Sequence, residues 1–191
     1  TYNFKEKIKK SLIHKSKPKI AIFREQGING HKEMSNAFNL AGFDSYDINT
    51  NDIINNPDIL DHYKGLVACG GFSYGDVLGA GRGWANKIIY NENAYSALSE
   101  FFNSKDKFTL GVCNGCQMLS NLKEIIPGSS HWPKFIQNDS KQFEARQVLI
   151  NIPKSNSILF NDMHGSIIPI IVSHGEGKVL ITNTKGLKKI T

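Results

Sequence analysis

The apolar and polar positions along the first two thirds of the chain predict strands that alternate with helices. Four segments have the apolar composition of strands: 20–23, 43–48, 66–69 and 108–112. Four others carry apolar residues at helical spacing: 34–41, 84–89, 95–102 and 118–122. This alternation predicts an α/β fold, with an open and mostly parallel sheet that has helices on both faces.

Beyond Pro127 the pattern changes, and strands follow one another without helices between them. Residues 143–150 alternate between apolar and polar side chains, as a strand with one solvent-exposed face does. Segments 167–172 and 179–181 indicate two further strands. We therefore expect additional β-strands in the C-terminal part of the same domain.

The chain divides into a short lysine-rich segment and one domain. Residues 1–18 are polar and end at a proline, so we expect a linker or arm, followed by the domain at 19–191. The chain begins with a threonine instead of a methionine, and we interpret it as a piece of a longer polypeptide.

The composition limits which partners and which cellular compartment we expect for the protein. The formal net charge of +6 comes largely from lysines near the two ends, which we interpret as solvated segments, so no nucleic-acid partner is expected. No apolar stretch approaches the roughly 18 residues of a membrane span, and no membrane partner is expected. The chain has three cysteines, too few for a disulfide framework, which favours a reducing, cytoplasmic location.

The candidate nucleophile is Cys113, which lies where the strand at 108–112 turns into a helix. Gly111 and Gly115 flank it at two residues on either side. This is the arrangement of a nucleophile elbow, in which small neighbours allow a sharp turn that pushes the side chain outward. The N–H groups at the start of the following helix favour the thiolate, which is the attacking species.

The other two cysteines, Cys69 and Cys116, are interpreted as packing residues, because free cysteine behaves as a small buried apolar side chain. A redox pair of Cys113 with Cys116 remains an alternative, since C-x-x-C motifs also join a strand to a helix. A zinc site would need further ligand pairs that the sequence lacks, so no metal is expected.

A cysteine that attacks a carbonyl also needs donors for the developing oxyanion. The N–H of Asn114, next after the nucleophile, is one predicted donor. The second is predicted in the turn formed by Gly70, Gly71 and Phe72, where glycines let the main chain approach a ligand closely. The glycine-rich segment 72–83 that follows is interpreted as a functional loop.

Several motifs together resemble the class I, or triad, glutamine amidotransferases, whose fold is flavodoxin-like. The family's G-x-C-x-G-x-Q elbow matches at Gly111, Cys113, Gly115 and Gln117. Four further stretches extend the likeness to the glutaminase domain of the large, single-chain formylglycinamidine ribonucleotide synthetases: REQGINGHKEM (24–34), ACGGFSYGDVLGAG (68–81), FEAR (143–146) and PIIVSHGEG (169–177).

The resemblance implies a glutamine amidotransferase of the ligase class in de novo purine biosynthesis. Cys113 would form a glutamyl thioester with glutamine and release ammonia to a synthetase domain of the same polypeptide. ATP and magnesium belong to that synthetase domain, so no cofactor is expected here. The residues implied in holding glutamine are the turn and elbow residues Gly70, Gly71, Phe72, Ser73 and Gln117, joined by His174 and Glu176.

The family's catalytic His-Pro-Glu motif is missing from the sequence. None of the six prolines follows a histidine, so we expect a domain truncated at its C-terminus. His174 and Glu176 match a separate motif and are interpreted as residues that shape the site, with a catalytic role as the alternative. We accordingly expect weak glutaminase activity, or none, from the isolated chain.

Three other functions remain open at this point. One is a thiol oxidoreductase built on Cys113 and Cys116. Another is a non-catalytic docking or channel module, and the last is a cysteine hydrolase of the same fold with a different substrate.

Overall fold

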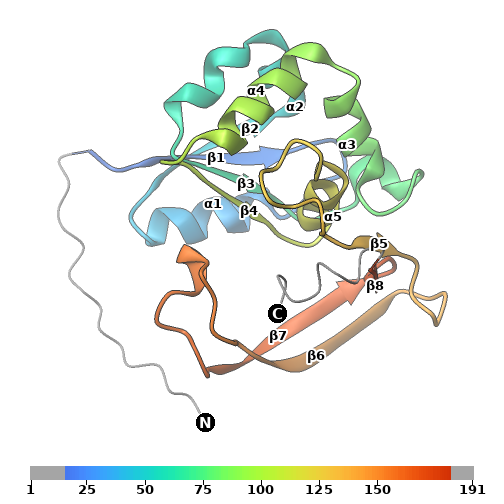
Figure 1. The fold of residues 1–191 in the computed structure, drawn as a ribbon. Helices are drawn as coiled ribbons and strands as arrows, with labels where there is room; N and C mark the ends of the chain where they lie inside the picture. Colours follow the sequence, from blue (N-terminus) through green and yellow to red (C-terminus); the bar gives the residue numbers. More distant parts are fainter. Residues whose placement is uncertain (1–15, 182–191) are drawn as a thin grey trace.

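A computed structural model describes residues 16–181 of the chain and contains a parallel sheet of four strands in the order β2-β1-β3-β4 (Figure 1). The strands are β1 (Lys19–Arg24), β2 (Asp44–Asn49), β3 (Gly65–Ala68) and β4 (Phe108–Gly111). Each neighbouring pair is parallel. The predicted open parallel sheet is therefore confirmed.

Helices cover both faces of this sheet, as predicted. They are α1 (His31–Leu40), α2 (Thr50–Asn55), α3 (Arg82–Ile89), α4 (Glu92–Asn103) and α5 (Asn114–Asn121). Figure 1 shows α1 on one face and α2, α3 and α4 on the other. The core between the layers is apolar: β3 is buried along its whole length, and Trp84 and Leu98 are fully buried in the same core cluster.

Two short helical elements were not predicted from the sequence pattern. Helix α2 has only 6 residues, too few to establish a helical period. Its signal is a capping box, in which the Asn49 side chain accepts from the N–H of Asp52 and the Asp52 side chain accepts from the N–H of Asn49. A 3₁₀ helix, Pro57–His62, then leads into β3.

The predicted loop at 72–83 is partly helical. It contains a 3₁₀ turn, Ser73–Asp76, and its last residues already belong to α3, which begins at Arg82. Tyr74, Asp76 and Ala80 have positive φ within it. A left-handed backbone at non-glycine residues is uncommon and concentrates at functional sites.

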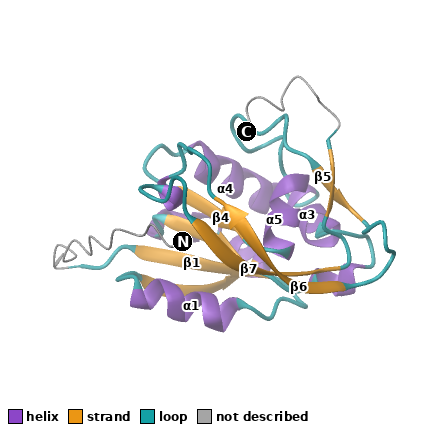
Figure 2. Ribbon diagram, turned by 90° about the horizontal axis from the view of Figure 1, so that it is seen from below, coloured by secondary structure: helices purple, strands orange, loops and turns teal. Residues whose placement is uncertain are grey.

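The C-terminal part forms two antiparallel pairs, which confirms the predicted extra strands (Figure 2). Strand β6 (Glu144–Asn151) pairs with β7 (Ile167–His174), and a 3₁₀ turn, Ile158–Phe160, lies between them in the chain. Strand β5 (Lys134–Ile136), which was not predicted, pairs with β8 (Lys178–Leu180).

The predicted arm at 1–18 lies mostly outside the described residues. Within the part that is described, no helix has the length and apolar character needed to cross a membrane.

Candidate functional site

Cys113 lies on a sharp turn between β4 and α5. Its backbone angles, φ 52° and ψ −117°, fall in a region that side-chain-bearing residues rarely adopt, and the residue is exposed. A Cβ atom on Gly115 would lie 2.1 Å from the carbonyl oxygen of Ala68, which leaves no room for a side chain there. The chain therefore has the elbow geometry that the glycine spacing predicts.

The turn after β3 lies directly against this cysteine. A Cβ atom on Gly70 would be 3.7 Å from the Cys113 sulfur and 3.0 Å from its Cβ, so a glycine at 70 leaves the space that the thiol occupies. Gly71 has φ +149°, and a Cβ there would lie 2.6 Å from the carbonyl oxygen of Gly27. Gly70 is thus required for the close approach of this turn to the elbow, and Gly71 for its close approach to the loop after β1.

The three predicted oxyanion donors differ in availability. The N–H of Phe72 donates to the carbonyl of Gly27 at 2.9 Å and is already engaged. Among the described residues, no hydrogen bond uses the N–H of Asn114 or of Gly71. We therefore keep Asn114 and Gly71 as the predicted donors and place Phe72 on the pocket wall.

A buried amide network connects the elbow helix to the glycine-rich loop. The Asn114 side chain, with no exposed surface, accepts from the N–H of Ser73 at 3.1 Å. Its amide nitrogen donates to Asp76 at 2.9 Å and to the side-chain oxygen of Gln117 at 3.0 Å. Gln117 in turn donates to the carbonyl of Glu176 at 2.7 Å. Both ends of the Gln117 amide are thus engaged within the protein.

The elbow opens into a pocket of about 190 Å³ that Asp76, Gln117 and Glu176 of this network help to line. Its lining residues come from the glycine loop, the elbow and the C-terminal hairpin: Gly71, Phe72, Asp76, Cys113, Gln117, Phe143, Ser173, His174, Gly175 and Glu176. The structure thus brings most of the predicted site residues into one pocket. Gly70, Ser73 and Asn114 are not among the lining residues; Ser73 and Asn114 are buried, and the backbone N–H of Ser73 donates to the Asn114 side chain.

The ionisable side chains that line the pocket are acidic, apart from Cys113 and His174. The sequence analysis missed Asp76, whose pKa is raised by burial against the opposing effect of the hydrogen bond from Asn114. The Glu176 carboxylate accepts from the N–H of Ala80 in the glycine loop. Because no lysine or arginine among residues 16–181 lines the pocket, the charge of its described lining favours a ligand with a cationic or hydrogen-bond-donating group.

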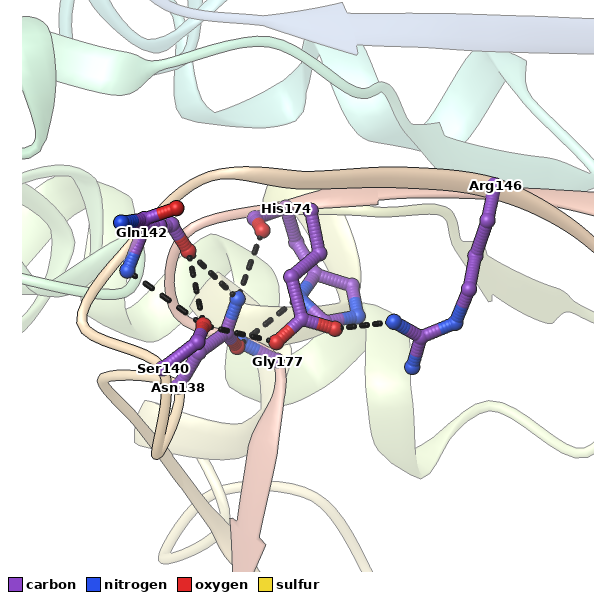
Figure 3. Close-up of polar contacts among 7 residues, drawn as sticks. Asn138, Ser140, Gln142, Arg146, His174 and Gly177 are labelled. Carbon is purple, nitrogen blue, oxygen red and sulfur yellow. Dashed lines mark hydrogen bonds and ion pairs between the residues drawn. The ribbon is translucent and has the colours of Figure 1, made fainter.

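His174 ends β7, and its imidazole is held by a residue that the sequence analysis also missed, Asn138 (Figure 3). The His174 Nδ1 lies 3.0 Å from the Asn138 side-chain oxygen. Asn138 is only 6% exposed, although it lies in a loop without any recognisable motif. Its one sequence signal is its residue type, because asparagine side chains commonly bind backbone groups in turns.

The two other cysteines differ from Cys113 in their surroundings. Burial raises the pKa of Cys69 to about 12, and it also raises the pKa of Cys116. Cys116 borders a different cavity, of about 390 Å³, together with Phe101, Phe102 and Trp132. Because Cys113 and Cys116 open into separate spaces, the packing interpretation of Cys116 fits the structure better than a redox pair. All three cysteines are free thiols.

Comparison with known proteins agrees with this architecture. The model of the CobB/CobQ-like glutamine amidotransferase domain family matches residues 17–191. In the structure of PurLQS from Thermotoga maritima, the matched chain is 24% identical with a TM-score of 0.68, over 88% of this chain and 71% of that one. A Thermoplasma acidophilum protein named as a GMP synthase component is 16% identical with a TM-score of 0.51, over 87% of this chain and 68% of that one.

The two structural matches show the same fold, and the family match covers nearly the whole chain. The cysteine elbow and its pocket lie inside the matched region. The chain therefore belongs to the CobB/CobQ-like glutamine amidotransferase domain family.

Proposed function

We propose that this domain is the glutaminase of a formylglycinamidine ribonucleotide synthetase and that Cys113 is its nucleophile. The observation that carries the proposal is the exposed Cys113 thiol, which lies on a strained elbow and opens to an acidic pocket. A Cβ atom added to Gly70 would lie only 3.7 Å from its sulfur. The motifs of the elbow, glycine loop and hairpin support the purine-pathway assignment, as does the fold shared with the Thermotoga maritima PurLQS chain.

In the proposed reaction the Cys113 thiolate attacks the side-chain amide carbon of glutamine. A carbon–sulfur bond forms, and the N–H groups of Asn114 and Gly71 stabilise the negative charge that develops on the amide oxygen. The carbon–nitrogen bond then breaks, and the nitrogen takes up a proton and leaves as ammonia. Water hydrolyses the glutamyl thioester, so that glutamine and water give glutamate and ammonia.

The ammonia passes to an ATP-dependent synthetase domain, which we place in the same polypeptide and in the cytoplasm. ATP and magnesium act in that domain. The likeness to a chain of the Thermotoga maritima PurLQS structure supports a glutaminase that works beside a synthetase, and the motifs shared with the single-chain enzymes support the same polypeptide. We assign Glu176 and Gln117 to the pocket wall, where they connect the hairpin with the elbow helix.

Acid quenching of the 191-residue chain during incubation with glutamine tests the nucleophile. We expect a glutamyl adduct on the peptide that contains Cys113, which Cys113→Ala abolishes and the matched control Cys116→Ala retains. Because the sequence contains no His-Pro-Glu, we expect slow turnover beyond this adduct. An adduct on Cys116 would refute the elbow assignment, and no adduct at all would favour a docking module.

A further inference from the structure

We infer that Asn138 is a positioning residue that fixes the tautomer of His174 and thereby makes the imidazole a hydrogen-bond acceptor in the pocket of Cys113. The inference depends on the proposed function only for the identity of the ligand, which is glutamine. The remaining argument concerns hydrogen bonds within the chain.

The backbone fixes the orientation of the Asn138 side-chain amide. Its nitrogen donates to the carbonyl of His174 at 2.9 Å and to the carbonyl of Gln142 at 3.0 Å. A carbonyl oxygen only accepts, so the atom that faces both carbonyls must be the NH₂ group. At the other end, the side-chain oxygen accepts from the backbone N–H of Gly177 at 3.0 Å. A flipped amide would lose all three bonds.

This orientation determines which imidazole nitrogen carries the proton. The Asn138 oxygen can only accept, and it lies 3.0 Å from His174 Nδ1, so Nδ1 must be the donor. A neutral imidazole has a single N–H, which leaves a lone pair at Nε2. No hydrogen bond among residues 16–181 involves Nε2. Nε2 thus has no partner among these residues, and His174 is one of the residues that line the pocket.

Asn138 also fixes the turn that carries His174. Its backbone N–H donates to the carbonyl of Gly175 at 2.9 Å. A Cβ atom on Gly177 would lie 2.2 Å from the imidazole, so glycine at this position keeps the ring seated on Asn138. Between these two glycines lies Glu176, whose carbonyl binds Gln117 and whose carboxylate binds the glycine loop. Asn138 thus positions the imidazole relative to the elbow.

The charged groups around His174 are carboxylates, which attract a ligand that carries N–H donors. Glu144 lies opposite His174 in the β6–β7 register, and the Ser140 hydroxyl and Arg146 hold its pKa below the usual value. Asp76 and Glu176 line the same pocket. Glutamine carries N–H donors at its α-ammonium group and at its side-chain amide, and either can bind Nε2.

The tautomer can be measured without any activity. In ¹⁵N spectra of the histidine rings of the 191-residue chain at about pH 8, where imidazole is normally neutral, we expect the His174 proton at Nδ1. Asn138→Asp preserves the acceptor and should preserve this tautomer. Asn138→Leu removes the acceptor and should give a mixture of the Nδ1-protonated and Nε2-protonated tautomers. Asn36→Leu, at an exposed position on α1, is the matched control and should change nothing.

Labelling kinetics with a glutamine-like electrophile test the acceptor function. Asn138→Leu should weaken binding about three- to tenfold, the effect of one hydrogen bond, and leave the maximal rate at Cys113 unchanged. An electrophile that lacks the α-amino group shows which end of glutamine binds: it loses the dependence on Asn138 only if the α-ammonium is the donor.

A proton at Nε2 in the wild-type chain, or an unchanged tautomer in Asn138→Leu, would overturn the inference even if Cys113 is the nucleophile. Should Asn138→Leu fail to fold, the wild-type spectrum still tests the inference, because a proton at Nε2 would overturn it. Failure of labelling with the tautomer intact would instead count against the proposed function.

Discussion

Replacing Gly70 by alanine tests the contact between the glycine turn and Cys113, the proposed nucleophile. The added Cβ would lie 3.0 Å from the Cβ of Cys113 and 3.7 Å from its sulfur. Carbon atoms in contact normally stay about 3.5–4.0 Å apart, so the cysteine must move by roughly half an ångström or more. The φ angle of Gly70 lies outside the left-handed region, so the backbone itself accepts alanine.

The expected loss of stability is modest, whereas the loss of reactivity is large. Overpacking costs about 1–3 kcal/mol, and reduced freedom of the unfolded chain offsets about 0.4–1 kcal/mol of that. A net loss of about 1–2 kcal/mol would lower the Tm by about 2–8 °C. A misplacement on the order of 1 Å at a reacting atom can cost about 100-fold in rate, so we expect labelling of Cys113 to slow by about 10- to 100-fold.

The assay compares labelling by a glutamine-like electrophile with thermal unfolding of the same variant. Gly30→Ala is the matched control, because its Cβ would meet the carbonyl oxygen of Gly70 at an ordinary 3.5 Å and its φ is −89°. If Gly70→Ala is labelled at the wild-type rate, the sulfur does not face this turn and the site geometry is wrong.

Three further predictions concern the elbow and its surroundings. Gly115→Ala should destabilise the protein by about 2 kcal/mol or more in urea unfolding, because its Cβ would lie 2.1 Å from the Ala68 oxygen; wild-type stability would contradict the packing of α5 on β3. Cys116→Ser should leave the labelling rate of Cys113 unchanged, and faster labelling in this variant would favour the redox pair, because a disulfide to Cys116 would block Cys113 in the wild type. Burial raises the pKa of Asp76 in the folded state above 3.8. The free energy of unfolding therefore falls as the pH rises through that folded-state pKa. Asp76→Asn should therefore stabilise the protein at neutral pH but not below about pH 3.8. Urea midpoints of the variant and the wild type measured at neutral pH and below about pH 3.8 test this. An equal effect at both pH values would contradict it.

The sequence pattern correctly predicted the elements that have a clear local signal, such as an apolar run or a fixed glycine spacing. The apolar runs at 20–23 and 66–69 became β1 and β3, because a strand buried on both faces needs apolar side chains throughout. The spacing of Gly111, Cys113 and Gly115 predicted the elbow, because only glycine fits beside that turn. Helix α2 and strand β5 are too short to produce a recognisable period.

The features that were missed depend on contacts between residues distant in sequence. Asn138 binds the turn at 174–177, more than 30 positions away in the sequence. No local sequence motif therefore indicates its function. The N–H of Phe72 proved unavailable because it pairs with Gly27 in the loop after β1. Ser73, predicted to touch glutamine, is buried by the same folding of the glycine loop. Pairings of this kind become visible only when the strands are placed side by side.

The account depends most on the sulfur of Cys113 being the atom that the pocket presents to glutamine. Peptide mapping of the 191-residue chain after reaction with one equivalent of a glutamine-like electrophile measures this directly. We predict a single label on Cys113, protection by excess glutamine, and no label on Cys69 or Cys116, whose thiols burial keeps protonated. A label on Cys116, or labelling of Cys113 that glutamine does not slow, would contradict the account.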